Sequence, residues 1–123
     1  MLYDSGVNDD QRIIIFGLPD IVREFATSQV HYYDGNFSMA PRAFRQVFVM
    51  RFKFMEDHLT GLYALLPNKT RRTYERVFEA TETIFQQLGV AMNVRKIKMD
   101  FEDGMMRAAS AIFGSHITNW ISI

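Results

Sequence analysis

Two aspartates, Asp34 and Asp100, are the residues of this sequence best suited to chemistry, because each follows a short run that predicts a β-strand. The runs are "SQVHYY" (28–33) and "VRKIKM" (94–99). If these strands are parallel neighbours, both carboxylates emerge at the same edge of a sheet, where ligands of open α/β sheets usually bind. Two close carboxylates repel each other unless a divalent cation lies between them. With a third acidic group, such a pair suits Mg²⁺.

Each aspartate also has a purely structural interpretation. Asp34-Gly35 is a common sequence for a tight hairpin turn, because both residues tolerate a positive φ. Asp100 is a candidate N-cap of a final helix, with Asp103 reaching back toward it. A cap residue can also bind a metal, so the sequence leaves these alternatives open.

Composition limits the function classes. The chain has 123 residues, of which 48% are hydrophobic and 23% charged, as expected for one globular domain or part of one. Its 14 basic residues balance its 14 acidic residues, so nucleic-acid binding would need a local basic patch. The absence of cysteine excludes disulfides, thiolate catalysis and cysteine-ligated zinc. The three histidines lack metal-ligand spacing.

The apolar runs and the amino-terminal sequence bear on location. The longest apolar runs, "IIIFGL" and "LYALL", are too short to span a membrane. The segment "MLYDSGVNDDQ" is polar and acidic, unlike a signal or transit peptide. We therefore expect an intracellular protein without a membrane partner, and we expect residues 1–11 to be disordered.

Apolar periodicity predicts the order of the elements. A strand, a helix and a second strand are followed by a long hairpin, a helix, a strand and a last helix, which together predict an α/β mixed sheet. A strand–helix–strand connection is normally parallel and right-handed, so the strand after the long helix should run parallel to its neighbour. The predicted strands are 12–16, 28–33, 44–54, 59–66 and 94–99, and the predicted helices begin at Pro19, Thr70 and Phe101.

The hairpin strand 44–54 has the clearest pattern. Its apolar parity is Phe44, Phe48, Met50, Phe52 and Phe54, interrupted by Gln46. The opposite parity carries Arg45, Arg51 and Lys53, which with Arg42 form either a solvated strand face or one side of a DNA path. We favour the solvated face. Arg71, Arg72 and Arg76 similarly predict a solvated first helical turn, with phosphate binding as the alternative.

Three segments resemble the Mutator-like element (MULE) transposase domain. They are "YYDGNFSMAPRAFRQVFVMR", "YALLPNKTRRTYERVFEA" and "IKMDFEDGMMRAA", and the resemblance covers residues 12–113. It implies a ribonuclease H-like fold and a DDE-type two-metal site that acts on DNA. Asp34 and Asp100 match the first and second catalytic aspartates, which would bind Mg²⁺ or Mn²⁺. The implied partner is the DNA of transposon ends, and the implied location of a functional protein is the nucleus. Self-association stays open.

The sequence departs from the family near its end. The family continues into a Cys-and-His segment, a helical insertion and a third catalytic acid, whereas this chain reads "IFGSHITNWISI". Only His116 is similar to that segment, and Glu102 and Asp103 are too close to Asp100 to replace a distant acid. We therefore expect a domain that is incomplete at its carboxyl end. Residues 114–123 should form a non-family tail, in which Trp120 has no assigned role, and the strand before Asp100 should expose an edge.

These features predict a fragment of a MULE-type transposase catalytic domain that is inactive alone, with metal binding weak or absent. Two alternatives remain: a domesticated non-catalytic derivative that binds DNA or a protein, and a gene-model remnant without function.

Overall fold

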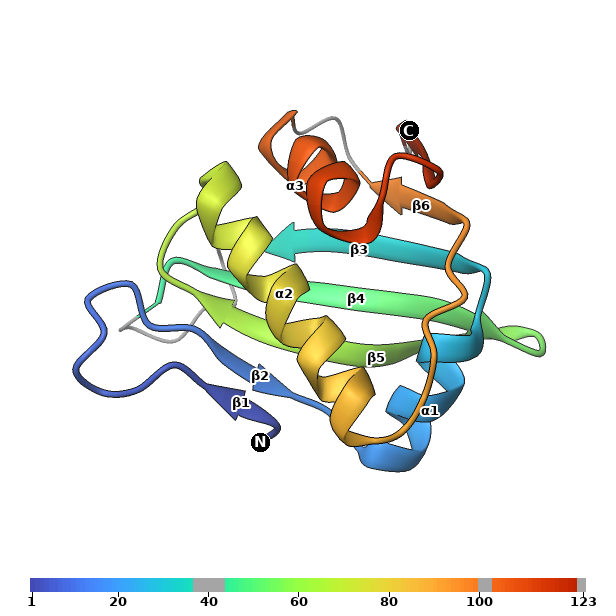
Figure 1. The fold of residues 1–123 in the computed structure, drawn as a ribbon, viewed down its shortest axis with the longest axis horizontal. Coiled ribbons are helices and arrows are strands. Elements are labelled where there is room, and N and C mark those ends of the chain that lie inside the picture. Colours follow the sequence, from blue (N-terminus) through green and yellow to red (C-terminus); the bar gives the residue numbers. More distant parts are fainter. Residues whose placement is uncertain (37–43, 100–102, 122–123) are drawn as a thin grey trace.

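The computed structural model describes residues 1–36, 44–99 and 103–121 as seven strands and three helices (Figure 1). The elements follow the predicted order closely, with a short extra strand near each end of the chain. The strands are β1 (Tyr3–Asp4), β2 (Ile14–Phe16), β3 (Val30–Asn36), β4 (Gln46–Phe54), β5 (Asp57–Leu66), β6 (Lys96–Met99) and β7 (Thr118–Ile121). The helices are α1 (Pro19–Thr27), α2 (Arg71–Gln87) and α3 (Asp103–Phe113).

The strands form one mixed sheet in the order β1-β2-β5-β4-β3-β6-β7. From β1 to β3 each neighbouring pair is antiparallel, and β6 pairs with β3 in parallel. The predicted hairpin therefore pairs with the strand that carries Asp34, and the chain returns through α2 to a parallel strand. Both features of the predicted mixed sheet are confirmed.

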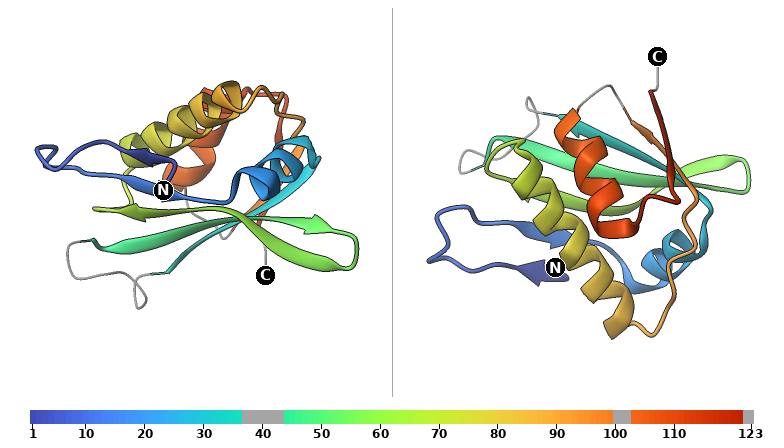
Figure 2. Two further views of the ribbon diagram at one scale, coloured as in Figure 1. Left: turned by 90° about the horizontal axis from the view of Figure 1, so that it is seen from below. Right: turned by 45° about the horizontal axis from the view of Figure 1, so that its top comes forward.

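The three helices lie on the same face of the sheet (Figure 2). The apolar parity of β4 points to them, since Phe48, Met50 and Phe52 are all buried. From α1, the Phe25 ring packs 5.7 Å from that of Phe52 and 5.8 Å from that of Phe85 on α2. The core therefore lies between the helices and one side of the sheet. Among the described residues, no helix has the length and apolar character that a membrane crossing needs.

Helix α2 begins and ends at residues whose chemistry predicts it. Thr70 is the N-cap, and its side chain accepts a hydrogen bond from the backbone N–H of Thr73. Just beyond the carboxyl end, Gly89 has φ +69°, the left-handed conformation that glycine adopts most easily. These ends position the apolar stripe that includes Val77, Phe78 and Ile84 over the sheet.

The prediction of disorder for residues 1–11 is wrong for the structure described here. Tyr3 and Asp4 pair with Ile15 and Ile14, which adds β1 to the sheet. Two ion pairs fix this segment: Arg12 contacts Asp4 at 2.6 Å, and Arg76 of α2 contacts Asp9 at 2.6 Å. The hydrogen bonds to Arg12 and to the Gly6 backbone lower the pKa of Asp4 to about 2. The acidic side chains of this segment, whose polarity indicated disorder, instead form ion pairs with Arg12 and Arg76.

The expectation that β6 exposes an edge of the sheet is also wrong. β7 pairs with β6 in parallel, with Trp120 opposite Lys98 and Ile121 opposite Met99. The segment 118–121 thus adds a strand to the sheet, within the part of the chain predicted as a non-family tail. Just before it, Ile117 is buried against the core.

This arrangement predicts the effect of a truncation. Deleting residues 114–123 would expose the backbone of β6 and remove the buried Ile117 side chain, so we expect the shortened chain to aggregate. Light scattering after size exclusion measures the change, and deletion of residues 122–123 alone is the control. A shortened chain that stays monomeric and unfolds at the same denaturant concentration would contradict a structural role for β7.

Candidate functional site

Asp34 lies within β3, near the middle of the sheet. It pairs with Val49 of β4, and Gly35 pairs with Phe48, so the strand continues through both residues to Asn36. The interpretation of Asp34-Gly35 as a tight turn is therefore wrong, and so is the expectation that the strand ends at Asp34. The Asp34 side chain is exposed, while the neighbouring Tyr33 is buried under the helices. Alternation along the strand thus directs Asp34 to the face of the sheet opposite the three described helices.

The second predicted ligand, Asp100, lies outside the described residues, as do Arg42 and Glu102. The strand that leads to Asp100 is described. β6 ends at Met99, which pairs with Tyr33, the residue directly before Asp34. The two strands are adjacent and parallel, as the site requires, and the meeting of the two carboxylates stays a prediction.

Gly35 makes room for a side chain on the other face of the sheet. A Cβ atom at Gly35 would overlap Oε1 of Gln46 and lie 2.9 Å from its Cδ atom. Gln46 is buried and donates a hydrogen bond from Nε2 to the Tyr74 hydroxyl of α2 at 3.1 Å. The space that Gly35 leaves is therefore occupied by the Gln46 amide.

Gln46 is a residue whose role the sequence analysis missed. The signal was present, because Gln46 interrupts the apolar parity of β4 at a position that is buried. A buried amide must find hydrogen-bond partners, and Tyr74 supplies one across the gap between sheet and helix. The pair connects the amino-terminal end of β4 to α2 and supports the part of β3 that carries Asp34.

Positive side chains share the exposed face with Asp34. Arg51 of β4 pairs with Tyr32, the residue two positions before Asp34 on the same face. Lys98 of β6 places Nζ 5.7 Å from the centre of the Tyr32 ring. Lys98 is only half-buried, because none of the described helices covers this face of the sheet.

The fit of a divalent metal to this region rests on one described ligand. The Asp34 carboxylate offers the hard oxygen donors that Mg²⁺ and Mn²⁺ prefer. Within residues 1–36, 44–99 and 103–121, no group of three or more acidic or histidine side chains is placed to bind a metal ion. Asp34 thus fits as one ligand, and a two-metal site would need further carboxylates.

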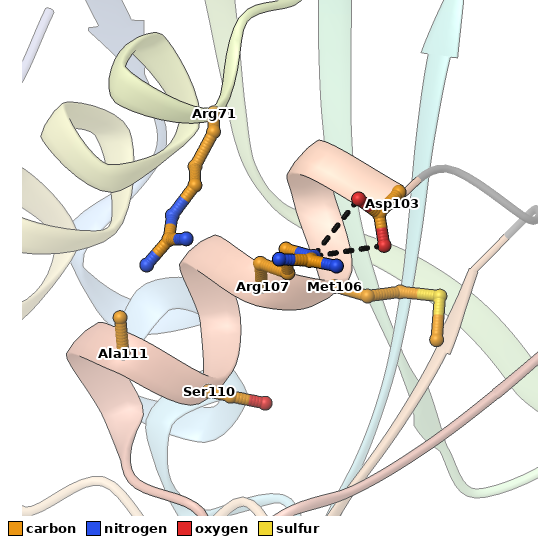
Figure 3. Close-up of a pocket in the computed structure, with 6 residues that line it drawn as sticks. All are labelled: Arg71, Asp103, Met106, Arg107, Ser110 and Ala111. Carbon is orange, nitrogen blue, oxygen red and sulfur yellow. Dashed lines mark hydrogen bonds and ion pairs between the residues drawn. The ribbon is translucent and has the colours of Figure 1, made fainter.

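A separate hollow of about 460 Å³ lies beside the amino-terminal ends of α2 and α3, lined by Arg71, Asp103 and Arg107 among others (Figure 3). Its arginines are engaged with acids. Arg71 contacts Glu75 at 2.9 Å, and Arg107 contacts Asp103, the first residue of α3, at 2.9 Å.

The next two arginines of α2 are paired in the same way. Arg72 contacts both Glu75 and Glu79, and Arg76 contacts Asp9. These pairs favour the interpretation of the α2 arginines as a structural, solvated first turn.

Comparisons with known proteins give no match to this chain, either among protein-family models or among curated proteins.

Proposed function

We propose that the chain is part of a MULE-type transposase catalytic domain, whose ancestral activity is metal-dependent cleavage and joining of DNA. The observation that carries the proposal is the position of Asp34. It is an exposed carboxylate on a central strand, on the face opposite the described helices, and the next strand is parallel and ends one residue before Asp100 in the sequence. A DDE-type site needs its first two acids on adjacent parallel strands.

The arrangement of elements supports the finer proposal of a ribonuclease H-like fold. The segments that resemble the family form β3 and β4, then β5 with the start of α2, and finally β6 with α3. They include a long antiparallel hairpin, a crossover helix and a strand parallel to the one that carries Asp34. We infer that β7, beyond β6, stands in the place of the family's final strand.

In this proposal Asp34 and Asp100 hold Mg²⁺ or Mn²⁺. When bound, the metal would activate water or a 3′ hydroxyl toward a phosphodiester and stabilise the leaving oxygen. The Asp34 carboxylate contributes negative charge and two oxygen ligands from a strand that is fixed on both sides by neighbouring strands. Because no third acid joins Asp34 among the described residues, we infer that the chain alone binds metal weakly and does not cut DNA.

Metal titration tests the site directly. We expect millimolar Mn²⁺ to broaden the amide NMR signals of residues 32–35 and 48–50, because the paramagnetic ion would sit at Asp34. Asp34→Asn should abolish this local broadening, since the amide lacks the negative charge. Asp20→Asn is the matched control, because Asp20 is a fully exposed aspartate on α1. Broadening that is absent, or that survives in Asp34→Asn, would contradict the metal site.

A nicking assay on supercoiled DNA separates binding from catalysis. We expect no metal-dependent nicking by this chain. Nicking that disappears in Asp34→Ala would contradict the inferred inactivity and would indicate that a residue of this chain, such as Glu102, supplies the third ligand.

A non-catalytic binding protein is the second candidate. It is favoured by the basic side chains Arg51, Lys53 and Lys98 on the exposed face of the sheet of a chain with no net charge. If metal titration gives no local broadening at Asp34, this second candidate becomes the stronger one.

A further inference from the structure

The three described helices lie on one face of the sheet. Phe25 of α1 packs against Phe52 and against Phe85 of α2, and Phe78 of α2 packs 4.8 Å from Phe113 of α3, so all three helices share one side. The views of Figure 2 show the same layering. We call the opposite side, as formed by the outward positions of β3, β4, β5 and β6, the open face. No described helix covers it.

One half of the open face is apolar. Val47 and Val49 of β4 pair with Leu65 and Tyr63 of β5, so these four side chains form a contiguous cluster. Tyr63 remains 41% exposed, and the other three are only half-buried. Phe16 of β2 extends the cluster by stacking on Tyr63 with ring centres 5.2 Å apart. Grouped apolar side chains left in water in this way indicate an interaction surface.

The other half of the open face is basic. Arg51 and Lys53 continue β4 at the next two outward positions, and both are exposed. Lys96 and Lys98 occupy the outward positions of β6, and Lys98 lies against the Tyr32 ring. Among the described outward positions of β3, β4 and β6, Asp34 is the acidic residue. The chain as a whole is neutral, so this half of the sheet carries a local excess of positive charge.

We propose that the open face binds an acidic amphipathic helix of a partner protein. The apolar stripe of the helix packs on Val47, Val49, Tyr63 and Leu65, and its Asp and Glu side chains pair with Arg51 and Lys53. From Val47 to Lys53 the strand extends about 20 Å. A helix rises about 1.5 Å per residue, so three to four turns match both halves. The proposal holds whether or not Asp34 binds a metal.

The charges and rings of the open face favour this occupant over two others. A second copy of the chain would place its own basic half or its apolar half against Arg51 and Lys53. It would therefore lack the row of acidic side chains that an acidic helix offers to these two residues. Single-stranded nucleic acid would need free aromatic faces for stacking. The Tyr32 ring already lies 4.6 Å from the His58 ring and 5.7 Å from Lys98 Nζ, and Tyr63 stacks on Phe16. The rest of the apolar half is aliphatic, with Val47, Val49 and Leu65, which suits a helix with a leucine stripe.

The test uses a designed, fluorescein-labelled helical peptide of about 14 residues with leucines at i, i+3, i+4 and i+7 and glutamates toward one end. Its counterpart has lysine in place of every glutamate. We expect the acidic peptide to bind at least about tenfold more tightly than the basic one, because charge complementarity discriminates between partners. Amide shift changes should fall on β3, β4 and β5.

Charge reversal provides the decisive variants. Arg51→Glu/Lys53→Glu should invert the preference, so that the basic peptide binds more tightly. Arg23→Glu/Arg107→Glu is the matched control, with the same change in net charge placed on α1 and α3, and it should keep the original preference. Both pairs are at exposed positions, and circular dichroism verifies that each variant is folded.

The remaining outcomes overturn the proposal. Equal binding of both peptides, or a preference that the Arg51→Glu/Lys53→Glu variant does not change, would show that the open face does not select an acidic helix. Tighter binding of an oligothymidine probe at the same residues would assign the face to single-stranded nucleic acid. Self-association through β4 in sedimentation experiments would assign it to a second copy.

Discussion

Replacing Gly61 with alanine should destabilise the fold by about 3 kcal/mol or more, the upper part of the range for overpacked cores. A Cβ atom at Gly61 would lie 2.6 Å from Cδ1 and 2.7 Å from Cβ of Phe25. Phe25 is completely buried, and its ring is held between His31, Phe52 and Phe85. Neither the ring nor the backbone of α1 has space to retreat, so the added methyl group must separate α1 from β5.

Gly61 is also the extra residue of a β-bulge. Met50 pairs with Leu62 and Arg51 pairs with Thr60, so the register between β4 and β5 shifts at Gly61. Urea unfolding monitored by circular dichroism measures the loss of stability. The double variant Gly61→Ala/Phe25→Ala is the control, since alanine at position 25 removes the Cγ and Cδ1 atoms of the clash and leaves only the Cβ contact, and the two changes should be clearly non-additive. A Gly61→Ala protein as stable as the original would contradict the packing of α1 on β5.

The helices and the long hairpin could be predicted because their signals are local. The alternation of Phe48, Met50 and Phe52 with exposed or half-buried neighbours identifies β4. After Pro67 the spacing of apolar residues changes from the period of a strand to that of a helix, which identifies α2. Thr70 and Gly89 define its ends through short-range backbone preferences. Such elements depend on residues within a few positions of one another, so one sequence is enough to find them.

β7 could not be predicted because its cause is not local. The four residues 118–121 show no alternation, and they form a strand through parallel pairing with β6, about twenty positions earlier. The same limit applies to Gly61, whose requirement comes from Phe25 of another element. Local sequence does not record such contacts.

For the candidate site, the sequence predicted the parallel orientation of the second strand but not the position of Asp34 within its own strand. An Asp-Gly pair can form a hairpin turn or continue a strand. Here, pairing with Val49 and Phe48 of β4 makes it continue the strand. The crossover rule predicted a parallel orientation for β6, which is confirmed, and its pairing with β3, which was a condition of the predicted site, is observed. The chemistry assigned to Asp34 and Asp100 remains a prediction, which the metal titration tests.

His31 is the buried titratable group expected to set the acid sensitivity of the fold. It is completely buried on β3, and its ring stacks 4.1 Å from that of Phe25. Nε2 lies 2.9 Å from the carbonyl oxygen of Phe25, which can only accept a hydrogen bond, so Nε2 carries the proton. Nδ1 therefore accepts the hydrogen bond from the Tyr33 hydroxyl at 2.7 Å. Burial also raises the pKa of Tyr33, which keeps this hydroxyl protonated as the donor.

A proton on Nδ1 would break this arrangement and place a charge in the core. Burial lowers the pKa of His31 from 6.5 to about 4, although the hydrogen bond to Phe25 opposes the shift. Between these two values the unfolded chain binds a proton that the folded chain does not. Stability from this group is therefore complete above pH 6.5 and is lost as the pH falls toward 4. A difference of about 2.5 units corresponds to about 3 kcal/mol.

The pH dependence of urea unfolding between pH 7 and 4 therefore identifies the contribution of His31. We expect His31→Gln to be less stable at pH 7, because it loses the two ring hydrogen bonds, and to lose about 3 kcal/mol less than the original chain between pH 6.5 and 4. His116→Gln is the control, since it removes a histidine that is exposed to water in the folded chain. If His31→Gln keeps the full pH slope, another group binds the proton on unfolding. Because His31, Tyr33 and Asp34 belong to one strand, acid unfolding through His31 would also disorder the candidate metal site, so metal titrations belong above pH 6.5.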